Sequence, residues 1–81
     1  MMLPAPTVEV YGKPDCSDTE RSRALLDARG VAYAYFDVST DDAAREHAES
    51  VSGSTCAPVV VLTDGVVLVE PTDDELEKAL T

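Results

Sequence analysis

The sequence predicts an α/β fold in which a four-stranded mixed sheet is covered by helices on both faces. Short runs rich in β-forming residues alternate with helical patterns, in the order β-α-β-α-β-β-α. The run at 59–62 is continuously apolar, which is typical of a strand covered on both sides. The 81 residues suffice for one small domain, which we expect to span 7–81 after a flexible tail at 1–6.

The first half of the chain predicts two strand–helix units. Apolar and polar residues alternate at 7–11, which indicates a strand, and a helix is expected at about 16–29, ending at Gly30. Aromatic residues favour a second strand at 31–37, and a capped helix follows at about 41–51. The buried face of that helix is predicted from four residues at helical spacing: Ala44, His47, Ala48 and Val51.

The second half predicts a hairpin and a short helix. Strands at 59–62 and 66–69 flank the turn Thr63-Asp64-Gly65, so this pair should be antiparallel. Thr72 and Glu75 have the spacing of a capping box, which opens a helix that continues to about residue 80. Because long connections join the first three strands, we expect these three to be parallel with right-handed crossovers.

The composition excludes several classes of function. The formal net charge is −10, and nine of these excess negative charges lie after residue 30. We interpret them as a solubilising acidic surface, which disfavours nucleic acids and anionic membranes. No apolar stretch approaches the roughly 18 residues of a membrane span, and residues 1–6 do not resemble a secretory signal. We therefore expect a cytoplasmic monomer that binds neither nucleic acid nor membranes.

Cys16 is the strongest candidate for chemistry. It stands where the first loop enters the predicted helix, whose first N–H groups lack partners and carry the positive end of the dipole. These groups favour the thiolate and lower its pKa. Lys13 adds a positive charge, and the Thr19 hydroxyl can donate to the sulfur, whereas Asp15 and Asp18 oppose ionisation. The alternative is a buried packing cysteine, which the polar neighbours disfavour.

Pro58, at the start of the apolar run 59–62, is the second signal. A proline is tolerated in a central strand at its first residue. A loop that enters a buried strand through proline often contains a cis bond, which exposes the preceding backbone. An ordinary trans proline at a strand start is the alternative, and the residues alone do not separate the two.

These segments together resemble the glutaredoxin branch of the thioredoxin superfamily over about residues 7–80. Residues 11–19, YGKPDCSDT, are similar to the family's Y-x-K-x-x-C-x-x-C pattern, and residues 52–58, SGSTCAP, to its S-G-x-x-T-V-P pattern. Residues 64–75 are similar to the C-terminal end of mycoredoxins, which act on mycothiol disulfides. Residues 57–60 are similar to those of ribonucleotide-reductase-associated redoxins. The resemblance implies a thioredoxin-like (glutaredoxin) fold.

The resemblance also implies a thiol–disulfide oxidoreductase that carries electrons. Cys16 would attack a disulfide and form a mixed disulfide with a protein or a small thiol. Pro58 would be cis, and the backbone of Ala57 would pair with the bound thiol as a short added strand. Thr72 and Asp73, at the start of the last helix, would offer N–H groups to a ligand carboxylate.

Two departures from the family pattern shape the expected mechanism. Thr19 replaces the second cysteine, so a second small thiol would resolve the mixed disulfide. Residues 69–72 replace the G-G-[acid] segment that many glutaredoxins use for glutathione. We therefore expect a low-molecular-weight thiol as co-substrate, mycothiol or glutathione, and favour mycothiol. We also expect a separate reductase as partner, with no tightly bound cofactor and no metal.

Cys56 is a candidate resolving thiol. It lies two residues before Pro58, in a loop that the family fold places opposite Cys16. A disulfide between the two would require a Cα separation below about 7 Å. An inert thiol is the alternative, and we favour it slightly.

Four other residues are weaker candidates. His47 lies on the predicted apolar stripe and is more simply a packed or edge residue than a base. Tyr11 ends the first strand, where it would line the thiol groove. Arg21 and Arg23 are expected on an exposed helix face, or alternatively as cations that steer an anionic thiol carrier.

Two other functions compete with disulfide reduction. One is a redoxin-fold binding module with little or no turnover, which the acids beside Cys16 and the missing second cysteine favour. The other is an iron–sulfur carrier, as single-cysteine glutaredoxins can be. Those carriers resemble C-G-F-S at the site, whereas this chain has Cys16-Ser17-Asp18-Thr19.

Overall fold

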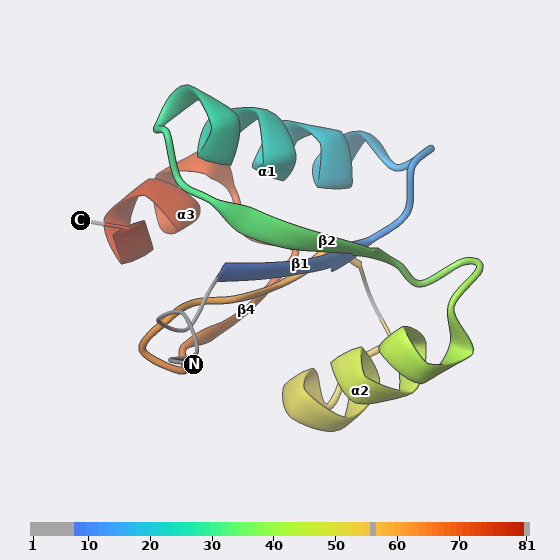
Figure 1. The fold of residues 1–81 in the computed structure, drawn as a ribbon. Coiled ribbons are helices and arrows are strands. Elements are labelled where there is room, and N and C mark those ends of the chain that lie inside the picture. The colour runs from blue at the N-terminus through green and yellow to red at the C-terminus, as the bar shows by residue number, and fades with distance from the viewer. Residues whose placement is uncertain (1–7, 56, 81) are drawn as a thin grey trace, which may run out of the picture.

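The computed structural model describes residues 8–55 and 57–80, and the predicted order of elements is confirmed (Figure 1). The strands are β1 (Val8–Gly12), β2 (Tyr33–Asp37), β3 (Val59–Val61) and β4 (Val67–Val69). The helices are α1 (Ser17–Ala28), α2 (Asp42–Ser52) and α3 (Asp73–Leu80). The strands form one sheet in the order β2-β1-β3-β4, with α1 and α3 on one face and α2 on the other.

Local backbone chemistry sets the helix ends close to the predicted positions. Asp41 caps α2 by accepting a hydrogen bond from the Ala44 N–H at 3.0 Å, and Gly53 ends this helix in the left-handed conformation. At the start of α3, Thr72 and Glu75 form the predicted capping box. The Thr72 N–H donates to Glu75 Oε1 at 2.8 Å, and the Glu75 N–H donates to Thr72 Oγ1 at 3.2 Å.

The direction of β3 differs from the prediction that the first three strands are parallel. β1 and β2 are parallel, but Tyr11 of β1 pairs with Val59 of β3 in antiparallel register. β3 is also antiparallel to β4, where Val59 pairs with Val69. A long crossover permits a parallel strand without requiring one. The apolar run of β3 suits a covered strand in either direction, so the sequence pattern carries no information on this point.

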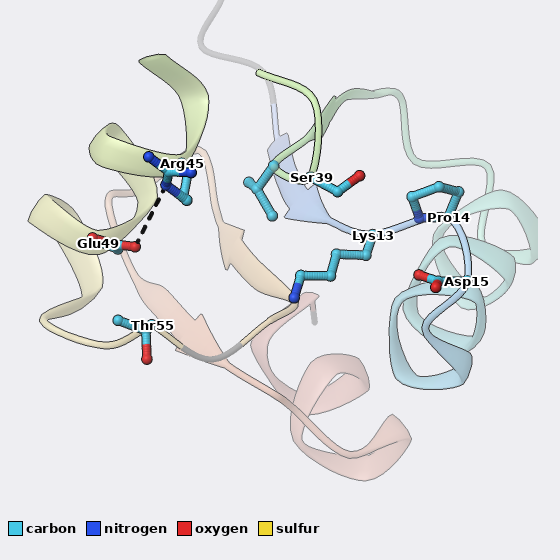
Figure 2. Close-up of a pocket in the computed structure, with 8 residues that line it drawn as sticks. Lys13, Pro14, Asp15, Ser39, Arg45, Glu49 and Thr55 are labelled. Atoms are coloured by element: carbon cyan, nitrogen blue, oxygen red, sulfur yellow. Dashed lines mark ion pairs between the residues drawn. The ribbon is translucent and has the colours of Figure 1, made fainter. Parts of the chain in front are cut away.

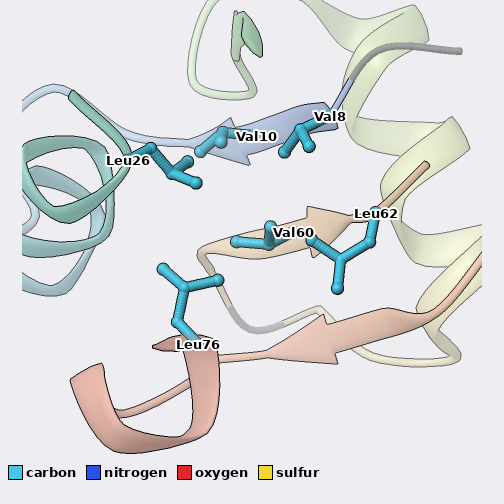
Figure 3. Packing of buried hydrophobic residues seen from close by; sticks show 6 residues of the cluster. All are labelled: Val8, Val10, Leu26, Val60, Leu62 and Leu76. Carbon is cyan, nitrogen blue, oxygen red and sulfur yellow. The ribbon is translucent and has the colours of Figure 1, made fainter. Parts of the chain in front are cut away.

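The larger core lies between the sheet and the helices α1 and α3. Its buried residues converge from β1, β3 and its following residue, α1 and α3 (Figure 3): Val8, Val10, Leu26, Val60, Leu62 and Leu76. A smaller core lies between the sheet and α2: Tyr11, Val38, Ala44, Ala48 and Val59. The face with two helices therefore supplies most of the apolar burial that stabilises the fold.

The predicted buried stripe of α2 is half correct. Ala44 and Ala48 are buried, but His47 and Val51 are exposed. The reason is that, among residues 8–55 and 57–80, α2 is the single helix on its face, so no second helix covers its flanks. The His47 ring instead lies beside the Tyr11 ring, with their centroids 5.6 Å apart. In the part of the chain that the structure describes, no helix is long and apolar enough to cross a bilayer.

Candidate active site

The segments predicted to carry chemistry meet at one end of the strands, where β1 ends at Gly12 and β3 begins at Val59. We call this end of the sheet the site edge. Because Tyr11 and Val59 pair in antiparallel register, the chain leaves β1 at the edge where it enters β3. The loop at 13–16 and the Ala57–Pro58 bond, which is cis as predicted, therefore belong to this edge.

Backbone hydrogen bonds join the ends of the outer strands to the same edge. The Val38 N–H, just after β2, donates to the Gly12 carbonyl at 3.0 Å. The Glu70 N–H, just after β4, donates to the Pro58 carbonyl at 2.8 Å. Segments that are distant in sequence thus meet around the start of α1.

Cys16 is the N-cap residue of α1, with extended backbone angles of φ −95° and ψ 120°. Its half-buried side chain makes no capping hydrogen bond, so the first N–H groups of the helix are not satisfied by a side-chain oxygen. The N–H and hydroxyl of Thr19, followed by the N–H of Asp18, lower the pKa of the Cys16 thiol below its ordinary value. Partial burial and the Asp18 carboxylate oppose this shift without reversing it. The geometry therefore favours a thiolate, as predicted.

Thr19, three residues after Cys16, has a completely buried side chain. Its hydroxyl oxygen accepts a hydrogen bond from the Lys13 N–H at 3.3 Å. The hydroxyl proton is therefore available to the Cys16 sulfur, which accounts for its part in lowering the Cys16 pKa. Gly12 makes room for this arrangement, because a Cβ there would lie 2.5 Å from two atoms of the Thr19 side chain.

The Lys13 side chain, from the loop before α1, extends into a groove of about 610 Å³ (Figure 2). The groups that lower the Cys16 pKa most belong to Thr19 and Asp18, and a role of Lys13 at the sulfur stays a prediction. The groove lies at the site edge between the loop before α1 and helix α2. Eight residues line it: Lys13, Pro14, Asp15, Val38, Ser39, Arg45, Glu49 and Thr55.

Sequence reasoning missed the contribution of α2 to this groove. Arg45 forms ion pairs with Asp42 at 3.1 Å and with Glu49 at 4.0 Å, and both Arg45 and Glu49 line the groove. In the sequence these charges have the spacing of an ordinary solvated helix face. They line the groove because the fold places α2 across from the Lys13 side chain.

Tyr11 and Ala57, two residues expected to contact a bound thiol, lie at the same small hollow. The hollow has a volume of about 20 Å³ and also includes Thr55. The Tyr11 ring stacks on Phe36, with centroids 4.9 Å apart, and its hydroxyl donates to Glu9 Oε1 at 2.9 Å. Tyr11 therefore supplies an apolar wall rather than a polar contact for a ligand.

The start of α3 is less open to a ligand than the sequence predicted. The Thr72 N–H already donates to the Glu75 carboxylate, so it is not free for an anion in this conformation. The Asp73 carboxylate lies 3.5 Å from Arg21 of α1. A ligand carboxylate could reach the Thr72 N–H only if Glu75 moved, and the anion site expected at Thr72 and Asp73 stays a prediction.

Cys56 lies outside the described residues, so its pairing with Cys16 remains a prediction. Within residues 8–55 and 57–80, no group of three or more His, Cys, Asp or Glu side chains is arranged to hold a metal ion.

Arg23 is half-buried rather than fully exposed. Its guanidinium lies 3.9 Å from the centroid of the Tyr35 ring and donates to the Tyr33 hydroxyl at 3.2 Å.

Comparisons with known proteins agree with this geometry. The family model described as glutaredoxin matches residues 8–68. The solved structure of the thioredoxin-like protein BC3987 is 35% identical, with a TM-score of 0.81, covering 89% of this chain and 97% of that one. A search of curated proteins finds no match.

Two more distant structures share the fold. Glutaredoxin grx-1 from Archaeoglobus fulgidus is 24% identical, with a TM-score of 0.82, covering 93% of this chain and 86% of that one. The glutaredoxin-like NrdH-redoxin from Escherichia coli is 19% identical, with a TM-score of 0.77, covering 89% of this chain and 92% of that one.

Proposed function

Because the chain belongs to the glutaredoxin family, we propose that it reduces mixed disulfides by a monothiol mechanism through Cys16. The observation that carries this proposal is the position of Cys16 as the N-cap of α1, where Thr19 and Asp18 lower the pKa of its thiol. The thiolate is the attacking form in thiol–disulfide exchange.

The first step is attack of the Cys16 thiolate on one sulfur of the substrate disulfide. A new S–S bond forms to Cys16, the original S–S bond breaks, and the departing thiolate takes a proton from water. A small thiol, as its thiolate, then attacks the mixed disulfide. Cys16 leaves as thiolate, and the small thiol forms a disulfide with the group that Cys16 carried. Each mixed disulfide thus consumes one free small thiol and yields the reduced substrate thiol and the disulfide of the small carrier, which a separate reductase would reduce.

The replacement of the second cysteine by Thr19 supports the one-thiol mechanism. A hydroxyl cannot form a disulfide, and this one is buried between Gly12 and the start of α1. It can still donate a hydrogen bond to the Cys16 sulfur, both when that sulfur attacks and when it leaves as thiolate. Thr19 can therefore stabilise the Cys16 thiolate by a hydrogen bond, but it cannot form a disulfide with Cys16.

The groove beside the Cys16 loop supports a small polar thiol as co-substrate. Its charged residues carry both signs: Lys13 and Arg45 against Asp15 and Glu49. Such a lining offers donors and acceptors to a thiol that bears hydroxyl groups, as mycothiol does. Glutathione is the second candidate, with the Lys13 ammonium facing its carboxylate. The backbone of Ala57 would pair with the extended part of either thiol as a short added strand.

A mixed-disulfide exchange assay tests the proposal. Mycothiol-linked and glutathione-linked model disulfides are supplied in turn, and release of the linked thiol is followed for the parent, Cys16→Ser and Cys56→Ser. We expect Cys16→Ser to abolish exchange and Cys56→Ser to retain at least part of it, with the mycothiol substrate preferred. Equal rates for the parent and Cys16→Ser would reject the proposal in favour of a binding module.

A further inference from the structure

The inference concerns Arg21, an arginine of α1 whose guanidinium contacts the first turns of two helices. Its Nη2 lies 2.7 Å from Asp18 Oδ1, and its Nε lies 3.5 Å from Asp73 Oδ1. Asp18 belongs to the first turn of α1 and Asp73 to the first turn of α3. Figure 1 shows these two helices side by side on the same face of the sheet.

Asp18 has two opposite effects on the neighbouring sulfur. Its N–H stabilises the Cys16 thiolate, whereas its carboxylate destabilises it by like-charge repulsion. A carboxylate that forms an ion pair repels a nearby anion less than a free one, because the paired cation cancels part of its field. Arg21 is the cation paired with this carboxylate.

We propose that Arg21 is a positioning residue for the Cys16 thiolate, which neutralises the Asp18 carboxylate while tying the start of α1 to the start of α3. The inference rests on the function proposed above and adds the residue that regulates the reactivity of its nucleophile. Arg21 itself does not touch the reacting atoms.

Other charged groups around Cys16 set the background against which Arg21 acts. Lys13 and Asp15 belong to the loop before α1. On β2, the Tyr35 hydroxyl is buried and its pKa is raised by burial, then by the Asp37 carboxylate and in smaller part by Asp15 and Cys16, whereas the Arg23 guanidinium opposes the shift. Tyr35 is neutral near pH 7, and Lys13 and Asp15 carry opposite charges that partly cancel. A change in the Asp18–Arg21 pair is therefore expected to alter the electrostatic field at the Cys16 sulfur.

The chain contains a matched control for this role. Arg29, at the C-cap of α1, pairs with Glu77 of α3 at 2.8 Å. This ion pair joins the same two helices and has similar exposure to that of Arg21. It lies at the other end of a 12-residue helix, about 20 Å along its axis from Cys16. Replacing Arg29 therefore removes the same charge and a comparable contact without changing the surroundings of the sulfur.

The experiment measures the alkylation rate of Cys16 by the neutral reagent iodoacetamide as a function of pH, at low salt and in a Cys56→Ser background. We expect Arg21→Gln to move the midpoint of the profile upward and to lower the rate near pH 7 by about two- to threefold, the scale of an exposed ion pair. Arg29→Gln should leave the profile unchanged, and Arg21→Lys should restore part of the loss. In an Asp18→Asn background, Arg21→Gln should have no effect, because the carboxylate that it screens is gone.

The outcomes separate this inference from the proposed function. A parent midpoint at or above the ordinary cysteine value of about 8.5 would contradict the proposed thiolate itself. A low parent midpoint that Arg21→Gln leaves unchanged, or shifts no more than Arg29→Gln does, would overturn the role of Arg21 alone. Thermal melts of both Gln variants verify that each remains folded. If Arg21→Gln does not fold, the alkylation profile of Arg21→Lys is compared with that of the parent instead.

Discussion

The first turns of α1 and α3 lie on the same face of the sheet but satisfy their backbone N–H groups differently. At α3, Thr72 and Glu75 close the helix start with two reciprocal hydrogen bonds. At α1, the N-cap is Cys16, which supplies no capping hydrogen bond. The N–H groups at the start of α3 are thus capped by side chains of the same helix start, whereas those at the start of α1 face the Cys16 sulfur. We call these the closed and the reactive helix start.

This difference teaches how a small fold separates stability from reactivity. A side-chain cap contributes about 1 kcal/mol to a helix start. At α1 that contribution is replaced by thiolate stabilisation, with Thr19 as its largest source. The predictions below test this contrast, beginning with the largest expected effect.

Replacing the sulfur by a hydroxyl should convert the reactive helix start into a closed one. In Cys16→Ser, disulfide exchange should fall to the uncatalysed rate, while the free energy of unfolding rises by about 0.5 kcal/mol because serine is a good N-cap. Exchange assays and urea denaturation measure the two effects. A variant that loses stability by more than about 1 kcal/mol would contradict the idea that this helix start lacks a cap.

Adding a methyl group at Gly12 should disturb the packing beneath the reactive helix start. The Cβ of Gly12→Ala would lie 2.5 Å from Thr19 side-chain atoms, so backbone or side chain must shift. We expect a loss of about 1–3 kcal/mol in unfolding free energy, the usual cost of overpacking, together with slower alkylation of Cys16. Gly65→Ala is a control for added bulk, since a Cβ there meets no atom within 4 Å, although its φ of 90° adds backbone strain. Unchanged Cys16 reactivity in Gly12→Ala would argue against the close fit.

Removing the Thr19 hydroxyl should raise the Cys16 pKa while leaving the main backbone contribution. Thr19→Val keeps the shape but removes the acceptor of the part-buried Lys13 N–H bond, at a cost of about 1 kcal/mol, the typical net value of one hydrogen bond. A depressed thiol pKa contributes stability that is present above the unfolded pKa of about 8.5 and is lost as pH falls through the native pKa. The stability gained by the parent between about pH 6 and about pH 9 should therefore shrink in Thr19→Val. Alkylation profiles and urea titrations at both pH values provide the test, and an equal gain in both proteins would contradict it.

Opening the closed helix start should have the smallest effect. Thr72→Ala removes one hydrogen bond of the capping box and should lower the unfolding free energy by about 1 kcal/mol. The alkylation profile of Cys16 should stay the same, because Thr72 is not among the groups that shift its pKa. A shift in that profile would mean that the two helix starts are coupled through more than Arg21.

Several features of the fold were predictable because they depend on residues close in sequence. The capping box of Thr72 and Glu75, the glycine stop at Gly53 and the N-terminal position of Cys16 all follow from the first or last turn of one helix. The alternation of strands and helices is equally local, since side-chain period and β propensity act over a few residues.

Parts of the site were not predictable because they depend on contacts between distant segments. The sequence pattern places His47 on a buried stripe, yet among the described residues no second helix lies beside α2 to cover it. The sequence also gives no sign that Lys13 and Arg45 line one groove. Charge spacing along α2 could not reveal that groove, because the same spacing serves any solvated helix.

The chain by itself determined where each helix begins, where two of them stop, and that a cysteine without a capping oxygen opens the first. These outcomes require only neighbouring residues, since hydrogen bonds within one helical turn span three or four positions. The tertiary structure alone decided that β3 runs antiparallel to β1, and it thereby brought Ala57 and Pro58 to the edge where Cys16 lies. Strand direction and side-chain burial depend on how whole helices and sheet faces pack to bury their apolar surfaces. A short segment of sequence does not contain this information.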